Sequence, residues 1–137
     1  MRIGELAERV GTSTRALRHY ESLGLLSSRR AANGYREYGE SDVRVVREIR
    51  TLLGIGFALE ETRPFVECLR AGYASGDACP ASMQVYRRKI AEIDACAASL
   101  AAVRTRLTQA VEGLGSEGPP VPLCSFTSSA GFFAAKE

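Results

Sequence analysis

The sequence has only one histidine and no long apolar run. The single histidine, His19, leaves little material for histidine-based catalysis. No apolar stretch approaches the roughly 18 residues that a bilayer span requires. The first ten residues, MRIGELAERV, alternate charged and apolar side chains, which is not the pattern of a secretory signal peptide. We therefore expect a cytoplasmic protein with no membrane partner.

Closely spaced cysteine pairs are also absent. The four cysteines lie too far apart for a CxxC zinc knuckle, and without a secretory signal they do not suggest a disulfide framework. We expect reduced thiols, some of them functional. They are Cys68, Cys79, Cys96 and Cys124.

Charge is unevenly distributed along the chain. The 137 residues carry a net charge of only +2. Between Arg9 and Arg36, however, six arginines face one acid, Glu21, so this window carries 6 − 1 = +5. A local basic field is typical of a nucleic-acid surface, although a solvated basic face has the same composition. The length suits one small domain with an accessory segment, or a domain that shares its core with a partner.

The first 24 residues have the spacing of a helix-turn-helix. Apolar residues recur every three or four positions up to Gly11, and Thr12 or Ser13 can cap a second helix over residues 14–22. Gly24 suits a left-handed helix end. On this second helix Leu17 can face the core, which leaves the basic side chains near the exposed face.

A hairpin and two further helices are predicted next. Asn33-Gly34 lies between two short polar-aromatic segments, and both residues tolerate positive φ, as a two-residue hairpin turn requires. A winged helix-turn-helix follows, with arginines on the wing. Another helix is expected to start at Ser41, and a further one carries Pro64 near its first turns.

From Pro80 onward the pattern is a heptad seam. Apolar residues alternate at steps of four and three, interrupted only by Arg104. One narrow stripe cannot be buried by a single helix, which favours a parallel or antiparallel coiled-coil dimer; packing of the stripe on the first domain is the alternative. The Gly/Pro/Ser-rich end contains several apolar residues and is expected to fold back as a loop or short helix. The predicted units are a DNA-binding domain at 1–72, a connector at 73–79, a dimerisation helix at 80–114 and an effector-binding tail at 115–137.

These elements together resemble the MerR family of bacterial transcription regulators. The resemblance rests on IGELAERVGTSTRALRHYESLGLL, NGYREY and DVRVVREIRTLLGIGFALEE, in that order and spacing. It implies a mainly α-helical homodimer, joined by antiparallel long helices, on a pseudo-palindromic promoter operator. In such regulators an inducer makes the dimer bend and untwist a promoter whose spacer is too long for bacterial RNA polymerase. His19, where the family usually has an aromatic residue, and Pro64, which could bend a helix, depart from the pattern.

The expected division of labour at the DNA follows from side-chain chemistry and from this resemblance. Arg15 and Arg18, three residues apart on one helical face, can reach base edges or phosphates. Tyr20, Tyr35 and Arg36 resemble the family's backbone-contacting positions, which fix register; for Tyr20 a place in the core is the alternative. The predicted DNA-binding residues are Thr14, Arg15, Arg18, His19, Tyr20, Arg30, Tyr35 and Arg36.

The cysteines suggest the inducer. Pro80 suits the first position of the long helix, and a thiol at a helix N-terminus, as at Cys79, is biased toward the thiolate that binds soft metals. The resemblance places Cys79 and Cys124 near metal ligands contributed by opposite subunits, with Cys68 as a third ligand. Two thiolates suit Hg²⁺ or Cu⁺, whereas Zn²⁺ would lack ligands. A further cysteine of the family's metal sensors is absent, since that neighbourhood reads Gly113-Leu114-Gly115.

Other functions remain open at this point. Cys79 could sense redox or electrophilic stress, or the tail could enclose an organic ligand among Tyr73, Phe126 and Phe132. A thiol enzyme would need a base near Cys79, and His19 belongs to the predicted reading helix, so we expect no enzyme. A coiled-coil adaptor that does not bind DNA would leave the basic wing unexplained. Cys96, beside the seam, is interpreted as a packing residue.

Overall fold

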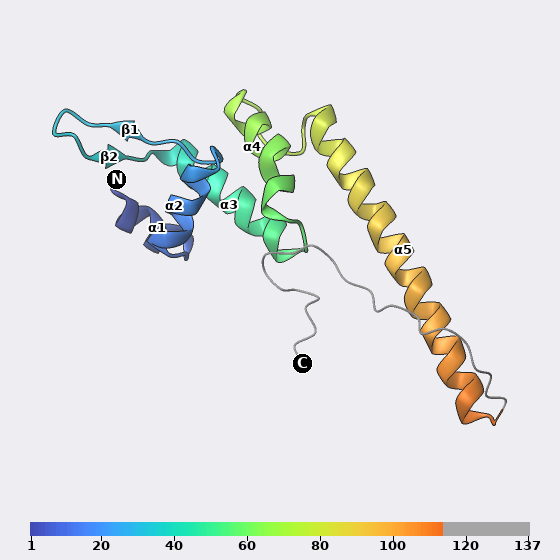
Figure 1. Cartoon of the computed structure of the whole chain (residues 1–137). Coiled ribbons are helices and arrows are strands. Elements are labelled where there is room, and N and C mark those ends of the chain that lie inside the picture. The colour runs from blue at the N-terminus through green and yellow to red at the C-terminus, as the bar shows by residue number, and fades with distance from the viewer. Residues whose placement is uncertain (114–137) are drawn as a thin grey trace.

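The structure, a computed structural model, describes residues 1–113, and these are mainly helical, as predicted (Figure 1). A two-stranded antiparallel hairpin is the only sheet in this part of the chain. The elements are α1 (Ile3–Val10), α2 (Thr14–Ser22), β1 (Arg29–Arg30), β2 (Arg36–Glu37), α3 (Glu40–Gly54), the 3₁₀ helix η1 (Leu59–Thr62), α4 (Arg63–Arg70) and α5 (Pro80–Val111).

The helix-turn-helix forms where the sequence predicts it. Gly11 takes the left-handed conformation with φ +74° and ends α1. The Ser13 hydroxyl oxygen accepts a hydrogen bond of 3.1 Å from the backbone N–H of Ala16, which caps α2. Gly24, with φ +76°, follows the end of α2. The predicted limits of this helix are confirmed.

The wing is a hairpin with a longer turn than predicted. Arg30 pairs with Arg36, so residues 31–35 lie between the strands. The N–H of Gly34 donates to the Ala31 carbonyl over 2.9 Å, and the N–H of Ala31 donates to the Tyr35 carbonyl over 2.8 Å. The expected two-residue Asn-Gly turn is therefore wrong, because this pair ends a wider turn, in which Gly34 has φ +85°. The hairpin extends well beyond the helices (Figure 1).

The helices after the wing differ slightly from the prediction. α3 starts at Glu40 rather than Ser41, because the Asp42 carboxylate accepts a 2.7 Å hydrogen bond from the N–H of Gly39. The single helix expected around Pro64 is divided into η1 and α4. Pro64 lies in the first turn of α4, where its missing N–H costs no helical hydrogen bond.

One apolar core joins α1, α2, α3 and α4. Leu6, Leu17 and Ile49 are completely buried in it, and each such side chain contributes roughly 1.5 to 3 kcal/mol of burial free energy. This core fixes the orientation of α2 relative to the wing, since Tyr38 at the end of the hairpin is also part of it.

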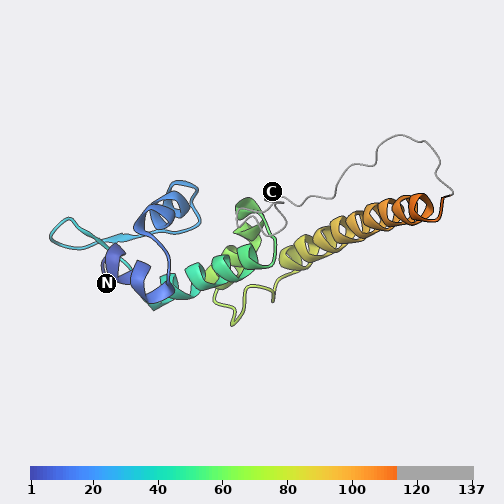
Figure 2. The same cartoon turned by 90° about the horizontal axis from the view of Figure 1, so that it is seen from below.

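A second, smaller core attaches α5. Phe57, Phe65, Leu52 and Val85 are buried together, and the ring of Tyr86 packs 5.1 Å from that of Phe65. Beyond this attachment α5 extends away from the other helices (Figures 1 and 2).

The apolar stripe of α5 is uncovered in the described chain. Ile90 is 56%, Leu100 52% and Leu107 62% exposed. The alternative in which this stripe packs on the first domain is therefore not what the structure contains. Separately, no helix within residues 1–113 combines the length and apolar character needed to cross a membrane.

Candidate nucleic-acid interface and cysteine pair

The exposed face of α2 carries its basic side chains. Arg15, Arg18 and His19 are exposed, and Thr14 at the first position is partly exposed. Leu17 lies on the opposite face, in the core. This separation arises from the helical period, which points residues three apart toward the same side.

The structure brings α2 and the wing to one surface. Arg18 from α2, with Arg30 and Arg36 from the hairpin, lines a shallow depression of about 450 Å³. The guanidinium groups lie at the rim of a polar floor that includes the Ser22 and Ser28 side chains. Several arginines around one depression form a surface that suits phosphate groups and base edges.

Acidic partners position some of these arginines. The Arg36 guanidinium donates to the Glu21 carboxylate over 2.8 Å, and the Tyr38 hydroxyl donates to the other oxygen of Glu21 over 3.1 Å. Arg9 pairs with Glu40. Within the described residues, the salt bridges include neither Arg15 nor Arg18.

The tip of the wing is equally accessible. Tyr35 is 56% exposed, and the Arg2 guanidinium lies 4.1 Å from the centre of its ring. Such a cation–π contact holds the ring without burying it. Tyr35 is therefore free to meet a partner with its hydroxyl and one face.

Tyr20 is a correction. The structure buries it in the main core with 6% of its surface exposed, which matches the core alternative rather than the predicted contact with DNA. Burial raises the pKa of the Tyr20 hydroxyl, while the Arg50 guanidinium nearby acts in the opposite direction. The period of α2 could have indicated this, because Tyr20 lies three residues after buried Leu17.

Sequence reasoning missed two arginines that hold the end of α2. Arg63, at the start of α4, donates to the Leu23 carbonyl over 2.6 Å. Arg70, at the end of α4, donates to the carbonyls of Gly24 and Leu25 over 3.2 and 2.7 Å. These carbonyls lack partners within their own helix, and cations satisfy them well. The distance of about forty residues along the chain gives no local signal for this contact.

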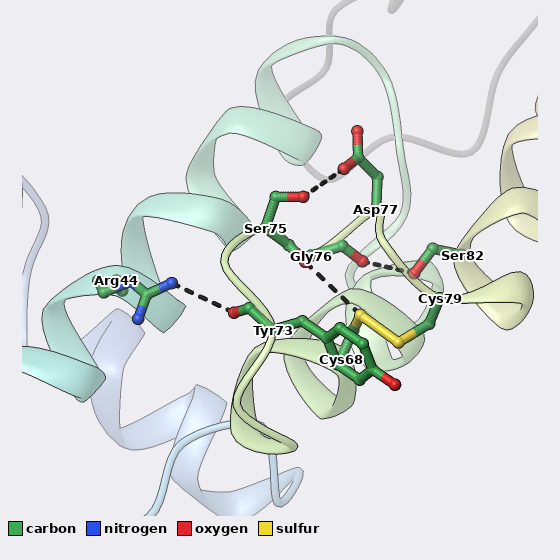
Figure 3. Close-up of a disulfide and its surroundings, with 8 residues drawn as sticks. All are labelled: Arg44, Cys68, Tyr73, Ser75, Gly76, Asp77, Cys79 and Ser82. Carbon is green, nitrogen blue, oxygen red and sulfur yellow. Dashed lines mark hydrogen bonds between the residues drawn. A yellow bond between two sulfur atoms is a disulfide. The ribbon is translucent and has the colours of Figure 1, made fainter.

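The cysteines give the second correction. Cys68 and Cys79 are joined by a disulfide, with 6.0 Å between their Cα atoms, so the expectation of reduced thiols is wrong for this pair (Figure 3). Cys68 lies on α4 and is 2% exposed, whereas Cys79 is the partly exposed residue immediately before α5. The loop between them doubles back and brings the two sulfurs together. That proximity agrees with the idea that Cys68 and Cys79 act at one site.

The loop is held by contacts other than the disulfide. Arg44 on α3 donates to the Ala74 carbonyl over 2.9 Å, and the Ser82 hydroxyl donates to the Gly76 carbonyl over 2.5 Å (Figure 3). A Cβ atom at Gly76 would lie 2.9 Å from the Glu48 carboxylate and 3.1 Å from Phe65 Cβ. Glycine therefore permits the close approach of this loop to α3 and α4.

Acidic groups gather beside the same loop. Burial raises the pKa of Glu48, and the negative charge of Asp77 raises it further. The pKa of Tyr86 is raised by burial and by the charges of Asp77 and Glu48. The Ser75 hydroxyl donates to Asp77 over 2.6 Å. These groups make the surroundings of the disulfide electrically negative.

The remaining predicted ligands can be followed only in part. Cys124, Phe126 and Phe132 lie outside the described residues. Tyr73 is 50% exposed on the loop between α4 and α5. Within residues 1–113 there is no group of three or more His, Cys, Asp or Glu side chains arranged to hold a metal ion.

Two family descriptions match the sequence. Residues 1–67 match the family described as "MerR HTH family regulatory protein", and residues 43–110 match "MerR, DNA binding". A regulator named "HTH-type transcriptional regulator HmrR" from Rhizobium leguminosarum bv. viciae is 34% identical over 125 residues, which cover 90% of this chain and 94% of that protein. "Heavy metal-dependent transcription regulator 2" of Rhizobium meliloti is 34% identical over 98 residues, covering 68% of this chain and 67% of that protein.

Solved structures share the fold. A crystal structure titled "HiNmlR, a MerR family regulator lacking the sensor domain, bound to promoter DNA" covers 89% of this chain and 98% of its own, with a TM-score of 0.52 and 23% identity. A MerR-type regulator from Listeria monocytogenes gives a TM-score of 0.55 at 22% identity, covering 83% of this chain and 85% of its own. At these identities the likeness concerns the fold alone.

Proposed function

Since the chain belongs to the MerR family of transcriptional regulators, we propose that it binds a pseudo-palindromic promoter operator as a homodimer and activates transcription by distorting the DNA. The observation that carries this proposal is the shared surface of α2 and the wing, where Arg18, Arg30 and Arg36 surround one depression. Arg15, Thr14, His19 and Tyr35 extend the same DNA-binding surface, and Tyr20 supports it from the core. Bacterial RNA polymerase is the further partner, and the cytoplasm is the expected location.

Dimer formation is proposed through the exposed stripe of α5. Two antiparallel copies would cover the side chains that a single copy leaves in water, including Ile90 and Leu107. The pairing of two DNA-binding domains would then mirror the symmetry of the operator.

The inducer is proposed to be a soft metal ion, Hg²⁺ or Cu⁺, bound by thiolates. The name of the heavy metal-dependent relative supports metal sensing, and the proximity of Cys68 to Cys79 supports a site at the start of α5. Cys79 and Cys124 are the proposed ligands, with Cys68 as the third. Bending a site of DNA costs on the order of 1 to 6 kcal/mol, so the metal must bind the activating state of the dimer more tightly by a comparable amount.

The metal proposal is tested with the reduced full-length protein. Titration with Cu⁺, Hg²⁺ and Zn²⁺ is followed by ultraviolet thiolate-to-metal absorbance and elemental analysis, and footprinting on the promoter beside the gene is run with and without the bound ion. Cys79→Ser should keep its DNA affinity within about twofold, since the change lies outside the basic surface, but should lose the metal-dependent footprint. Cys96→Ser is the control and should respond normally. A Cys79→Ser variant that still responds would contradict the thiolate site.

A further inference from the structure

The Cys68–Cys79 pair is asymmetric. Cys68 is buried on α4, whereas Cys79 is partly exposed and precedes the first turn of α5. An incoming thiol therefore reaches the Cys79 sulfur first. The N-terminus of the long helix favours a thiolate at Cys79 when the bond is broken.

The surroundings accommodate the reduced form as well as the disulfide. The Ser75 carbonyl oxygen lies 3.5 Å from Cys68 Sγ (Figure 3). A disulfide sulfur carries no proton to donate, but a reduced Cys68 thiol has an acceptor already in place. Arg44 and Ser82 hold the loop independently of the sulfur bond. The two thiols would thus remain close together after reduction.

We propose that Cys68 and Cys79 form a reversible thiol–disulfide site, and that its oxidised form blocks binding of the soft metal ion. The blocking part rests on the proposed function, because one sulfur pair cannot be bonded internally and bind a metal at the same time. Disulfides inside cells are usually transient and redox-sensing, which agrees with this assignment.

The chemistry is thiol–disulfide exchange. A thiolate of an external dithiol attacks Cys79 Sγ, the bond to Cys68 Sγ breaks, and Cys68 keeps the electron pair and takes up a proton. The second thiol of the reductant then attacks the mixed disulfide and releases Cys79. The dithiol leaves as its own disulfide. In the reverse direction a two-electron thiol oxidant accepts two electrons and two protons from the pair.

The disulfide also joins two parts of the fold that matter for DNA binding. Cys68 belongs to the helix whose Arg63 and Arg70 hold the end of α2. Cys79 begins the helix proposed to form the dimer. Oxidation therefore fastens the start of α5 to α4, and reduction leaves this junction free to follow a bound metal.

Peptide mapping of the full chain tests the site. Trypsin cuts after Arg70, so Cys68 and Cys79 fall on separate peptides, residues 51–70 and 71–87, which only a disulfide can join. We expect the joined peptide to form when reduced protein is treated with diamide under anaerobic conditions, and to disappear on treatment with dithiothreitol. Absence of the joined peptide would overturn the proposal.

Cu⁺ uptake, measured against a chromophoric Cu⁺ chelator after removal of small thiols, tests the blocking step. Wild-type protein should lose at least tenfold in Cu⁺ affinity as the joined peptide forms, whereas Cys68→Ser should keep its own affinity through the same treatment. Unchanged affinity in the joined wild type, or equal losses in both proteins, would overturn the inference. If reduced wild type binds no Cu⁺ at all, the proposed metal response is wrong, and the reversible appearance of the joined peptide decides the redox site alone.

Discussion

Replacing Lys89 by methionine should detach the start of α5 from the DNA-binding domain. The Lys89 ammonium group is buried, with 4% of the residue exposed, and lies 3.0 Å from a carboxylate oxygen of Glu61 and 3.1 Å from one of Glu92. It also lies 5.3 Å from the centre of the Phe57 ring. Methionine keeps the volume and the aromatic contact but removes the charge.

The size of the effect follows from what the substitution leaves behind. Breaking a buried ion pair from one side typically costs about 3 to 5 kcal/mol. The Glu61 side chain is 17% and the Glu92 side chain 39% exposed, so both can recover part of their hydration, and we expect a loss of about 2 to 3 kcal/mol. For a chain of this size that loss lowers the thermal midpoint by roughly 5 to 10 °C.

Urea unfolding followed by circular dichroism, at one fixed protein concentration, measures this loss. Arg88→Met is the matched control, since Arg88 is the exposed neighbour on the same helix, and it should change stability by less than about 0.5 kcal/mol. Glu61→Gln and the double variant complete a cycle, in which we expect a coupling energy of about 1 kcal/mol or more. Equal effects of the Lys89 and Arg88 substitutions, or a coupling energy near zero, would refute the reasoning.

Three further predictions concern DNA binding, pH and assembly. Arg18→Ala should cost about 1 to 3 kcal/mol of operator binding in fluorescence anisotropy if the guanidinium reads a base, with exposed Arg87→Ala as control; unchanged affinity would remove Arg18 from the interface. Because folding raises the pKa of Glu48, the stability contributed by its protonated form is present below the unfolded value of about 4.3 and is lost as pH rises through the folded value. Glu48→Gln should therefore raise the thermal midpoint at pH 7 but not below about pH 4, and a gain that does not vary with pH would argue against this cause. Leu100→Glu should raise the dimer dissociation constant about tenfold or more in sedimentation, whereas Ala102→Glu, off the seam, should leave it nearly unchanged.

Local chemistry explains which elements could be predicted from the sequence. Ser13, Gly11 and Gly24 act through hydrogen bonds or φ angles within a few residues, so the ends of α2 were predictable. The turn of the wing was predicted too short, because Asn33-Gly34 also fits a longer loop. The start of α5 at Pro80 was evident from proline's preference for a first helical turn.

Long-range contacts explain what could not be predicted. Arg63 and Arg70 reach carbonyls more than forty positions away or close to it, and no periodicity encodes such a pairing. The Cys68–Cys79 bond depends on the path of the loop, which packing of Gly76 against Glu48 determines. For Tyr20, the core and the DNA surface are adjacent on one short helix, and only packing decides between them.

Sedimentation of a fluorescently labelled promoter duplex with the purified, reduced chain at low salt tests the central claim most directly. The account predicts that the duplex sediments with two copies of the chain, and that Arg18→Ala shifts this binding to higher protein concentration. A chain that remains monomeric and leaves the duplex sedimenting alone would contradict it.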